Sequence, residues 1–154
     1  MNSGNELTPL SVKDEPIVNW PTEGGQHYTL VMTDPDAPSR KEPTRGQIKH
    51  WIVVNIPGTN LTRGETIVEY LGSAPPEGSG LHRYIFLVYK QPGLLKHSET
   101  LIKANTREGR PHFKVREFAE KYNLGQPIAG NFYQAQHDDY VKELRAKWAR
   151  EEAN

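Results

Sequence analysis

Two carboxylates and a group of hydrogen-bond donors stand out as residue types that could act on one ligand. Asp34 and Asp36 lie two positions apart, so an extended backbone places both on one face. His50 follows, and the segment His82–Tyr84 (His-Arg-Tyr) adds side chains that donate hydrogen bonds to anions. All of them border strongly apolar stretches that are expected to form strands. We expect them to form a small pocket for a negatively charged molecule.

The residue types also suggest how such a pocket would be held together. Asp36 can form a bidentate pair with Arg83 and fix the loop after the first strand to the sheet. Asp34 can orient His50 or His82 and favour the charged form of the imidazole. The histidines, the nearby tyrosine hydroxyl and backbone N–H groups would then face the anion. Sequence spacing alone does not establish that these groups meet.

Other interpretations of the same residues remain open. Asp-Pro pairs are common in turns at strand ends, and a histidine before an apolar strand is more often structural. Asp34, Asp36 and His50 are also the kinds of ligand with which a hydrolase binds a divalent metal and activates water. The sequence contains no HExxH, GxSxG, P-loop or GxGxxG motif that would support an enzyme. We therefore favour a binding protein over an enzyme.

The composition limits the class of partner. The 154 residues suffice for one domain with its own core. Lys and Arg number 19, as do Asp and Glu, and the formal net charge of zero disfavours nucleic-acid binding or membrane attachment by charge alone. Cysteine is absent, which favours a reducing compartment and excludes disulfides. The polar first residues predict no signal peptide, so we expect a cytoplasmic globular protein.

Four stretches have the apolar patterns of strands, namely 28–33, 51–56, 83–89 and 129–136. The third is apolar on both faces, as in a central strand that is covered on both sides. Two stretches have apolar residues at helical spacing, namely 114–122 and 137–152. Residues 58–66 and 73–80 are predicted to be loops. Because strands come first and helices mostly late, we expect an antiparallel β-sandwich with peripheral helices, one of them C-terminal.

At these residues the chain resembles the phosphatidylethanolamine-binding protein family, and in particular its animal cytosolic branch, which includes the Raf kinase inhibitor protein. The resemblance is carried by separate motifs in order: TDPDAPSR at 33–40, His50, Gly-Ser-Ala-Pro-Pro at 72–76, GLHRY at 80–84, Ala129-Gly130 and Tyr-Gln-Ala at 133–135. It extends from about Leu7 to Trp148. Several motifs in the same order are far more specific than a single tripeptide.

The resemblance implies a β-sandwich domain over residues 1–154 with a pocket for phosphorylated head groups, such as phosphorylethanolamine, or for small anions. The implied ligand-binding residues are Asp34, Asp36, Pro38, His50, Gly72, Ala74, Pro75, His82 and Tyr84. Arg83 is implied to support the aspartates, and the bond Ala37–Pro38 to be cis. No catalytic residue, metal or cofactor is implied. Members inhibit kinases or serine proteases or act as scaffolds in signalling.

The chain departs from the family pattern at three places. The family usually has a strand pair before the segment that matches Glu6, so we expect this sheet to have an unpaired edge. Ala74 stands where many relatives have glycine. Arg145 stands where animal relatives often have a tyrosine at the pocket rim, so it either contacts phosphate or points to solvent.

We therefore interpret the chain as a monomeric, non-enzymatic protein that binds phosphatidylethanolamine or another phosphorylated molecule. It would modulate a kinase or a serine protease, with peripheral membrane contact and without nucleic acid. The alternatives are a metal-dependent phosphoester hydrolase that uses the Asp-Pro-Asp motif, and a protein-interaction module whose pocket is vestigial.

Overall fold

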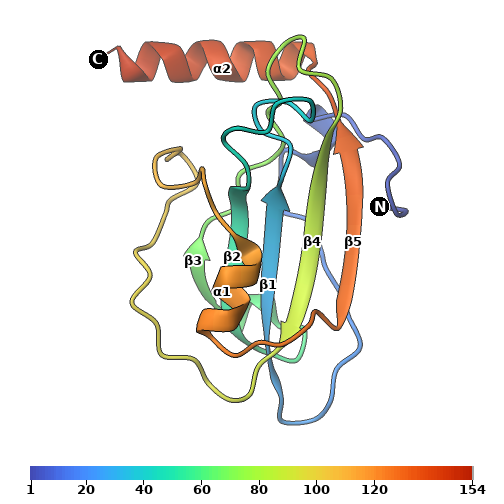
Figure 1. Cartoon of the computed structure of the whole chain (residues 1–154), viewed down its shortest axis with the longest axis vertical. Coiled ribbons are helices and arrows are strands. Elements are labelled where there is room, and N and C mark those ends of the chain that lie inside the picture. Colours follow the sequence, from blue (N-terminus) through green and yellow to red (C-terminus); the bar gives the residue numbers. More distant parts are fainter. Residues whose placement is uncertain (154) are drawn as a thin grey trace.

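One antiparallel sheet organises the chain (Figure 1). The computed structural model describes residues 1–153. The strands are β1 (His27–Asp34), β2 (Ile48–Pro57), β3 (Glu65–Val68), β4 (His82–Lys90) and β5 (Ala129–Ala135), in the spatial order β3-β2-β1-β4-β5. Every neighbouring pair is antiparallel. The helices are α1 (Val115–Lys121) and α2 (Asp139–Glu152), with 3-10 turns η1 (Leu10–Val12) and η2 (Leu61–Arg63). A mainly β, antiparallel fold with peripheral helices is therefore confirmed.

The predicted strands match β1, β2, β4 and β5 to within a few residues, but β3 was missed. The stretch 58–66 was predicted to be a loop, whereas it contains η2 and the first residues of β3. In β3 the first two residues are exposed and the last two, Ile67 and Val68, are buried. A strand this short has no alternating pattern that sequence inspection could detect.

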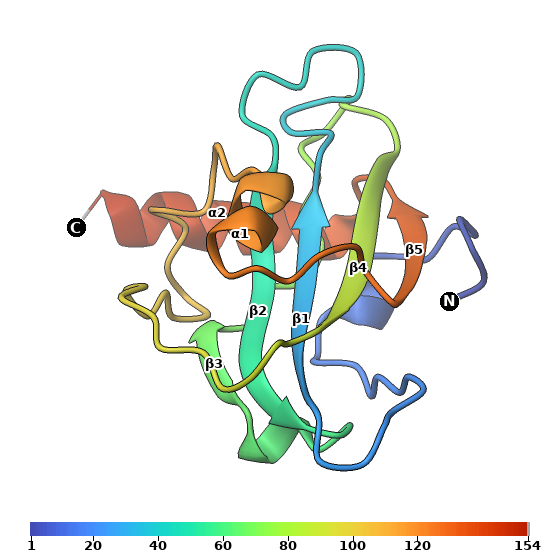
Figure 2. The same ribbon diagram turned by 60° about the horizontal axis from the view of Figure 1, so that its bottom comes forward.

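Both faces of the sheet are covered by apolar side chains from other segments. On one face, the N-terminal residues Leu7, Val12, Val18 and Trp20 pack against a cluster that includes Trp51. On the other face, α1 covers the sheet (Figure 2), and its Val115, Phe118 and Ala119 join a second cluster with the buried residues of β2 and β3. Because both faces are packed, the ends of the central strands are held in fixed positions. Side chains at the sheet end are thereby positioned for a binding site.

The expectation of an unpaired sheet edge is wrong for β5. The N-terminal segment runs along β5 and exchanges backbone hydrogen bonds with it. The donor nitrogen lies 2.9 Å from the acceptor oxygen for Gly4 and Phe132, 2.8 Å for Leu7 and Gln134, and 3.0 Å for Gln134 and Asn5. On the opposite edge, Ile102 exchanges backbone hydrogen bonds with Ile67 and Glu69 beside β3. Extended coil thus satisfies backbone groups that would otherwise invite pairing with another chain.

Helix α2 lies across the end of the sheet at which β1 and β5 finish and β4 begins (Figure 1). Its first turn is capped by the Asp138 side chain, which accepts a hydrogen bond of 2.9 Å from the Val141 N–H. Val141 and Trp148 are its buried residues, and they fix which face of the helix is turned inward. In the described part of the chain, no helix is both long and apolar enough to cross a membrane.

Candidate functional site

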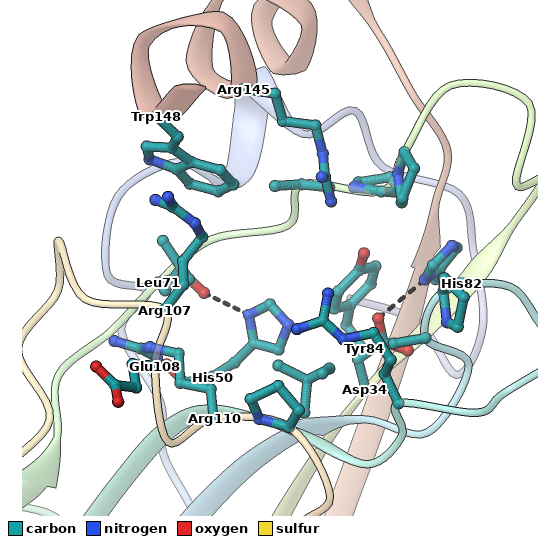
Figure 3. Close-up of a pocket in the computed structure, with 18 of the residues that line it drawn as sticks. Asp34, His50, Leu71, His82, Tyr84, Arg107, Glu108, Arg110, Arg145 and Trp148 are labelled. Carbon is teal, nitrogen blue, oxygen red and sulfur yellow. Dashed lines mark hydrogen bonds and ion pairs between the residues drawn. The ribbon is translucent and has the colours of Figure 1, made fainter. Parts of the chain in front are cut away.

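A cavity of about 690 Å³ opens at this end of the sheet (Figure 3). Antiparallel pairing brings together the end of β1, the start of β2 and the start of β4, and therefore Asp34, His50 and His82. Helix α2 covers the opposite side of the cavity with Arg145 and Trp148. The residues that line it include the predicted Asp34, Pro38, His50, Ala74, Pro75, His82, Tyr84 and Arg145. Asp36, Gly72 and Arg83 lie outside the lining.

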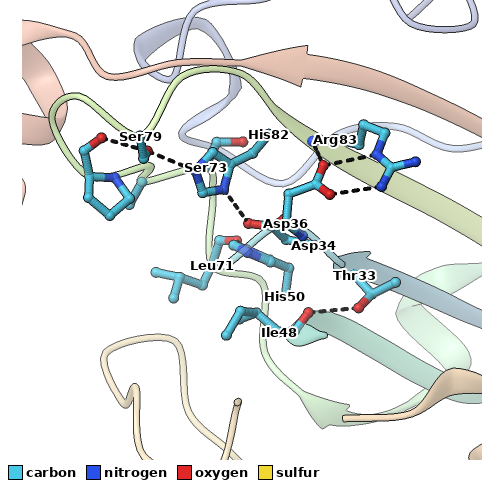
Figure 4. Close-up of polar contacts among 12 residues, drawn as sticks. Thr33, Asp34, Asp36, Ile48, His50, Leu71, Ser73, Ser79, His82 and Arg83 are labelled. Carbon is cyan, nitrogen blue, oxygen red and sulfur yellow. Dashed lines mark hydrogen bonds and ion pairs between the residues drawn. The ribbon is translucent and has the colours of Figure 1, made fainter. Parts of the chain in front are cut away.

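Asp34 and His82 form the first polar unit of the site (Figure 4). The His82 Nδ1 lies 2.9 Å from the Asp34 Oδ2, and both residues are buried. The His82 Nε2 lies 2.8 Å from the Oγ of Ser79, which donates in turn to the Pro76 carbonyl. Both ring nitrogens of His82 therefore have protein partners. His82 can donate to an anion, as expected, only if the Ser79 hydroxyl moves away from its Nε2.

Asp36 and Arg83 form a second unit that points away from the cavity (Figure 4). The Asp36 Oδ2 accepts from the Nε and the backbone N–H of Arg83 at 2.9 Å, and its Oδ1 accepts from Nη2 at 2.8 Å. Burial alone would raise the pKa of Asp36, but the hydrogen bonds and charge of Arg83 hold it below its ordinary value. The expected bidentate pair is present, and it ties the loop after β1 to β4. The expected cis bond at Ala37–Pro38 is also present.

His50 is the histidine that is open to a ligand. Its Nδ1 lies 2.6 Å from the Leu71 carbonyl, so this nitrogen carries the proton in the neutral ring. Its Nε2 has no hydrogen-bond partner within residues 1–153. Burial lowers the pKa of His50, the charge of Arg110 lowers it further, and the charge of Asp34 opposes the shift. At neutral pH the Nε2 is therefore an acceptor, and it becomes a donor when the ring takes up a proton.

Tyr84 lies between the two histidines and is held rigidly by aromatic contacts. Its ring stacks on Tyr133 with centroids 5.2 Å apart and lies nearly parallel to His82 at 6.2 Å. His50 meets it edge-on at 5.3 Å. Burial raises the pKa of Tyr84 well above its ordinary value, so its hydroxyl keeps its proton at physiological pH and can donate to an anion.

The wall opposite the histidines depends on a contact between α2 and residues 74–75. Nε and Nη2 of Arg145 donate to the Ala74 carbonyl at 2.9 and 2.6 Å. Arg145 is an exposed residue that reaches from α2 to the cavity, which its side chain lines (Figure 3). Gly72 has a packing role, because an added Cβ would lie 2.9 Å from the Val12 carbonyl oxygen. Gly72 itself is outside the cavity lining, whereas Leu71 and Ala74 on either side of it line the cavity.

The cavity also contains residues that the sequence did not point to. Arg45 and Arg107 line it, and Trp148, which was predicted only to pack, lies beneath two guanidinium groups. Arg110 is buried, and its side chain donates to five backbone carbonyls, those of Lys49, His50, Glu69, Lys103 and Thr106. None of these residues belongs to a recognisable motif, so only the folded chain shows their position.

The metal-hydrolase alternative loses its donor set in this geometry. Both carboxylate oxygens of Asp36 accept hydrogen bonds from Arg83, which leaves Asp34 and His50 without a third ligand. In the described range, no three His, Cys, Asp or Glu side chains group in a way that could hold a metal ion. The arrangement instead offers donors to an anion in a cavity with a fixed frame.

Comparison with known proteins gives a consistent relationship. A family model described as phosphatidylethanolamine-binding protein matches residues 3–134. A Drosophila melanogaster protein named "Putative odorant-binding protein A5" is 39% identical over 144 residues, which cover 94% of this chain and 69% of that protein.

Two solved structures support the same relationship. The solution structure of CG7054 is 51% identical, with a TM-score of 0.72, over 91% of this chain and 80% of that one. The crystal structure of carboxypeptidase Y inhibitor complexed with its cognate proteinase is 31% identical, with a TM-score of 0.71, over 88% of this chain and 76% of that one. The chain therefore belongs to the phosphatidylethanolamine-binding protein family.

Proposed function

We propose that the protein binds phosphorylated head groups, such as that of phosphatidylethanolamine, or small anions in the cavity at the sheet end. The observation that carries this proposal is the free Nε2 of His50 beside the proton-bearing hydroxyl of Tyr84, both in the lining of one preformed cavity. Asp34 borders the same space, where its carboxylate can receive the ammonium of an ethanolamine group. The family match supports the same ligand class.

The state of His50 sets how a phosphoryl group would bind. Because Nδ1–H is committed to the Leu71 carbonyl, neutral His50 can accept the O–H of a phosphate monoanion at Nε2. A phosphate dianion requires His50 to take up a proton first, since only the imidazolium donates from both nitrogens. The affinity for a phosphate dianion should therefore fall as the pH rises. In the free protein His50 gains its proton below about pH 6.5, since burial lowers its pKa.

We further propose that the protein acts by binding other proteins and not by catalysis. Its relative at 31% identity is a carboxypeptidase Y inhibitor, solved in complex with its proteinase. A protease or a kinase is accordingly the class of partner we propose, and occupation of the cavity would alter the loops around its mouth. We propose a cytoplasmic monomer that meets lipid head groups by peripheral membrane contact.

Calorimetric titration with phosphorylethanolamine tests the binding site. We expect His50→Ala to weaken binding about tenfold, because it removes a charge-assisted contact worth roughly 1.4 kcal/mol. His27→Ala is the matched control, because His27 lies at the end of β1 opposite to Asp34. The affinity of this variant for phosphorylethanolamine should equal that of the native protein. Equal affinity for all three proteins would refute the assignment of the site.

The partner class is tested by inhibition assays against a serine carboxypeptidase and a protein kinase, with and without phosphorylethanolamine. We expect inhibition that changes with ligand and with His50→Ala. Inhibition that ignores both would identify the protein as an interaction module with a vestigial pocket.

A further inference from the structure

The mouth of the cavity carries more positive charge than one phosphoryl group needs. Arg45, Arg107 and Arg145 all line the cavity. In Figure 3 Arg107 lies at the left and Arg145 at the top, and the Asp34–His82 pair lies at the right. Their concentration is notable in a chain whose formal net charge is zero. Arg110 also lines the cavity, but its donors are used by backbone carbonyls, so it belongs to the frame.

Aromatic contacts hold two of these guanidinium groups in place. The Arg107 guanidinium carbon lies 4.2 Å from the centroid of the Trp148 ring, and that of Arg145 lies 5.7 Å from it. Stacking on tryptophan restricts a side chain that would otherwise have many rotamers. The two groups are thereby positioned before any ligand arrives, which reduces the entropy cost of binding one.

The hydrogen bonds of these arginines leave donors free. Arg145 is bonded to the neutral carbonyl of Ala74, and Arg45 has no side-chain hydrogen bond or ion pair among the residues described. Only Arg107 has a carboxylate partner, Glu152. Glu108 is the other carboxylate at the mouth. Burial is the largest cause that lowers the pKa of Arg145, and the charges of Arg107 and Arg45 lower it further, so each of these two cations repels Arg145. A bound anion would relieve that repulsion.

The size of the cavity gives an independent reason to expect a larger ligand. A volume of about 690 Å³ lies within the range of roughly 300–1,000 Å³ that encloses a whole small molecule. A single phosphate beside His50 and Tyr84 would leave the space beneath the arginines unfilled.

We propose that Arg45, Arg107 and Arg145 form a second anion subsite, so that the cavity takes ligands that carry two phosphoryl groups joined by a short linker. This inference rests on the proposed function, since it places the first phosphoryl group beside His50. Guanidinium groups suit the second one because they donate to phosphate oxygens in pairs. The ligand is either a free organic bisphosphate or a lipid head group with an additional phosphate.

The test compares propyl phosphate with a set of alkane bisphosphates whose linkers run from ethane to pentane, by calorimetry. We expect at least one bisphosphate to bind the native protein about tenfold more tightly than propyl phosphate. In the variant Arg45→Gln/Arg145→Gln that ratio should fall to about one. The ratio of the two affinities is the readout, because the loss of two positive charges weakens the binding of every anion.

The matched control removes the same charge elsewhere. Arg63→Gln/Arg150→Gln changes two exposed arginines outside the cavity lining, and it should keep the preference. Circular dichroism with a thermal scan confirms that both variants fold. A second arm uses phosphatidylcholine vesicles that contain either phosphatidylinositol or its monophosphate. Preferential binding to the monophosphate vesicles identifies a lipid source, and preference for the soluble bisphosphate alone identifies a free one.

The outcomes separate the two proposals. If propyl phosphate binds and no bisphosphate binds more tightly, the second subsite is refuted while the proposed function stands. A preference that survives Arg45→Gln/Arg145→Gln also refutes it. If neither class of phosphate binds, the proposed function fails and the second subsite fails with it.

Discussion

Asp34 and Asp36 are two residues apart and almost equally buried, yet their carboxylates have different surroundings. Asp36 faces Arg83, and three hydrogen bonds satisfy it completely on the side away from the cavity. Asp34 borders the cavity and holds His82, whose other nitrogen is held by Ser79. Asp36 is thus built into the frame outside the cavity. Asp34 lies in the cavity lining, although its Oδ1 also accepts a hydrogen bond of 2.7 Å from the Asp36 N–H. The motif combines a structural part and a binding part within three residues.

The largest effect should come from the frame. Arg83→Ala leaves the buried Asp36 carboxylate without its cation, and we expect a loss of about 3 kcal/mol in the free energy of unfolding. Urea denaturation measures it. Arg63→Ala, an exposed arginine of η2, is the control and should change stability by less than about 0.5 kcal/mol. A similar small change for Arg83→Ala would show that the pair does not hold the loop.

The second effect concerns His50 on the cavity side. Because burial lowers its pKa in the folded state, stability should be fully present above the unfolded value of about 6.5 and decrease as the pH falls below it. The loss is about 1.4 kcal/mol for each unit by which the folded pKa is lowered. Denaturation at about pH 7.5 and about pH 5.5, for the native protein and His50→Gln, measures the difference. An identical pH dependence in both would place the titrating group elsewhere.

A third, smaller effect is expected where Ser79 meets His82. Ser79→Ala removes the hydroxyl that links His82 to the Pro76 carbonyl, and we expect a loss of about 1 kcal/mol in stability. It also frees the His82 Nε2, so binding of inorganic phosphate should not weaken. Calorimetry and urea denaturation follow the two quantities. Weaker phosphate binding would mean that Ser79 itself contacts the anion.

The smallest expected effect separates the two aspartates by ligand preference. Asp34→Asn removes the charge proposed to meet an ammonium group, so phosphorylethanolamine should lose about threefold in affinity relative to inorganic phosphate. Asp36→Asn, if folded, should leave that ratio unchanged, because Asp36 lies outside the cavity. Equal changes in both variants would remove the distinction between the two carboxylates.

The sequence was informative where local chemistry decides the structure. Long apolar runs predicted β1, β2 and β4, and the complementary geometry of a carboxylate and a guanidinium predicted the Asp36–Arg83 pair. It failed where tertiary packing decides. Ile67 and Val68 are too few to reveal a strand, and the coverage of β5 by residues 4–7 depends on the return of the N-terminal segment.

The same contrast applies within the candidate site. Asp34, His50 and His82 were expected from residue types next to predicted strands, and Pro38, Ala74 and Pro75 from the family resemblance; all six lie in the cavity lining. The Ser79 contact to His82, and the convergence of Arg45 and Arg107 with Arg145, follow from how loops and α2 pack. An arginine in an unremarkable segment gives no local signal of the cavity that it lines.

A crystal structure of the complex with phosphorylethanolamine tests the central claim most directly. The phosphoryl oxygens should lie about 2.6–3.2 Å from the His50 Nε2 and from the Tyr84 hydroxyl, with the Asp36–Arg83 pair unchanged behind them. A phosphoryl group bound to Arg83 in place of Asp36, or on a surface that His50 does not reach, would contradict the account.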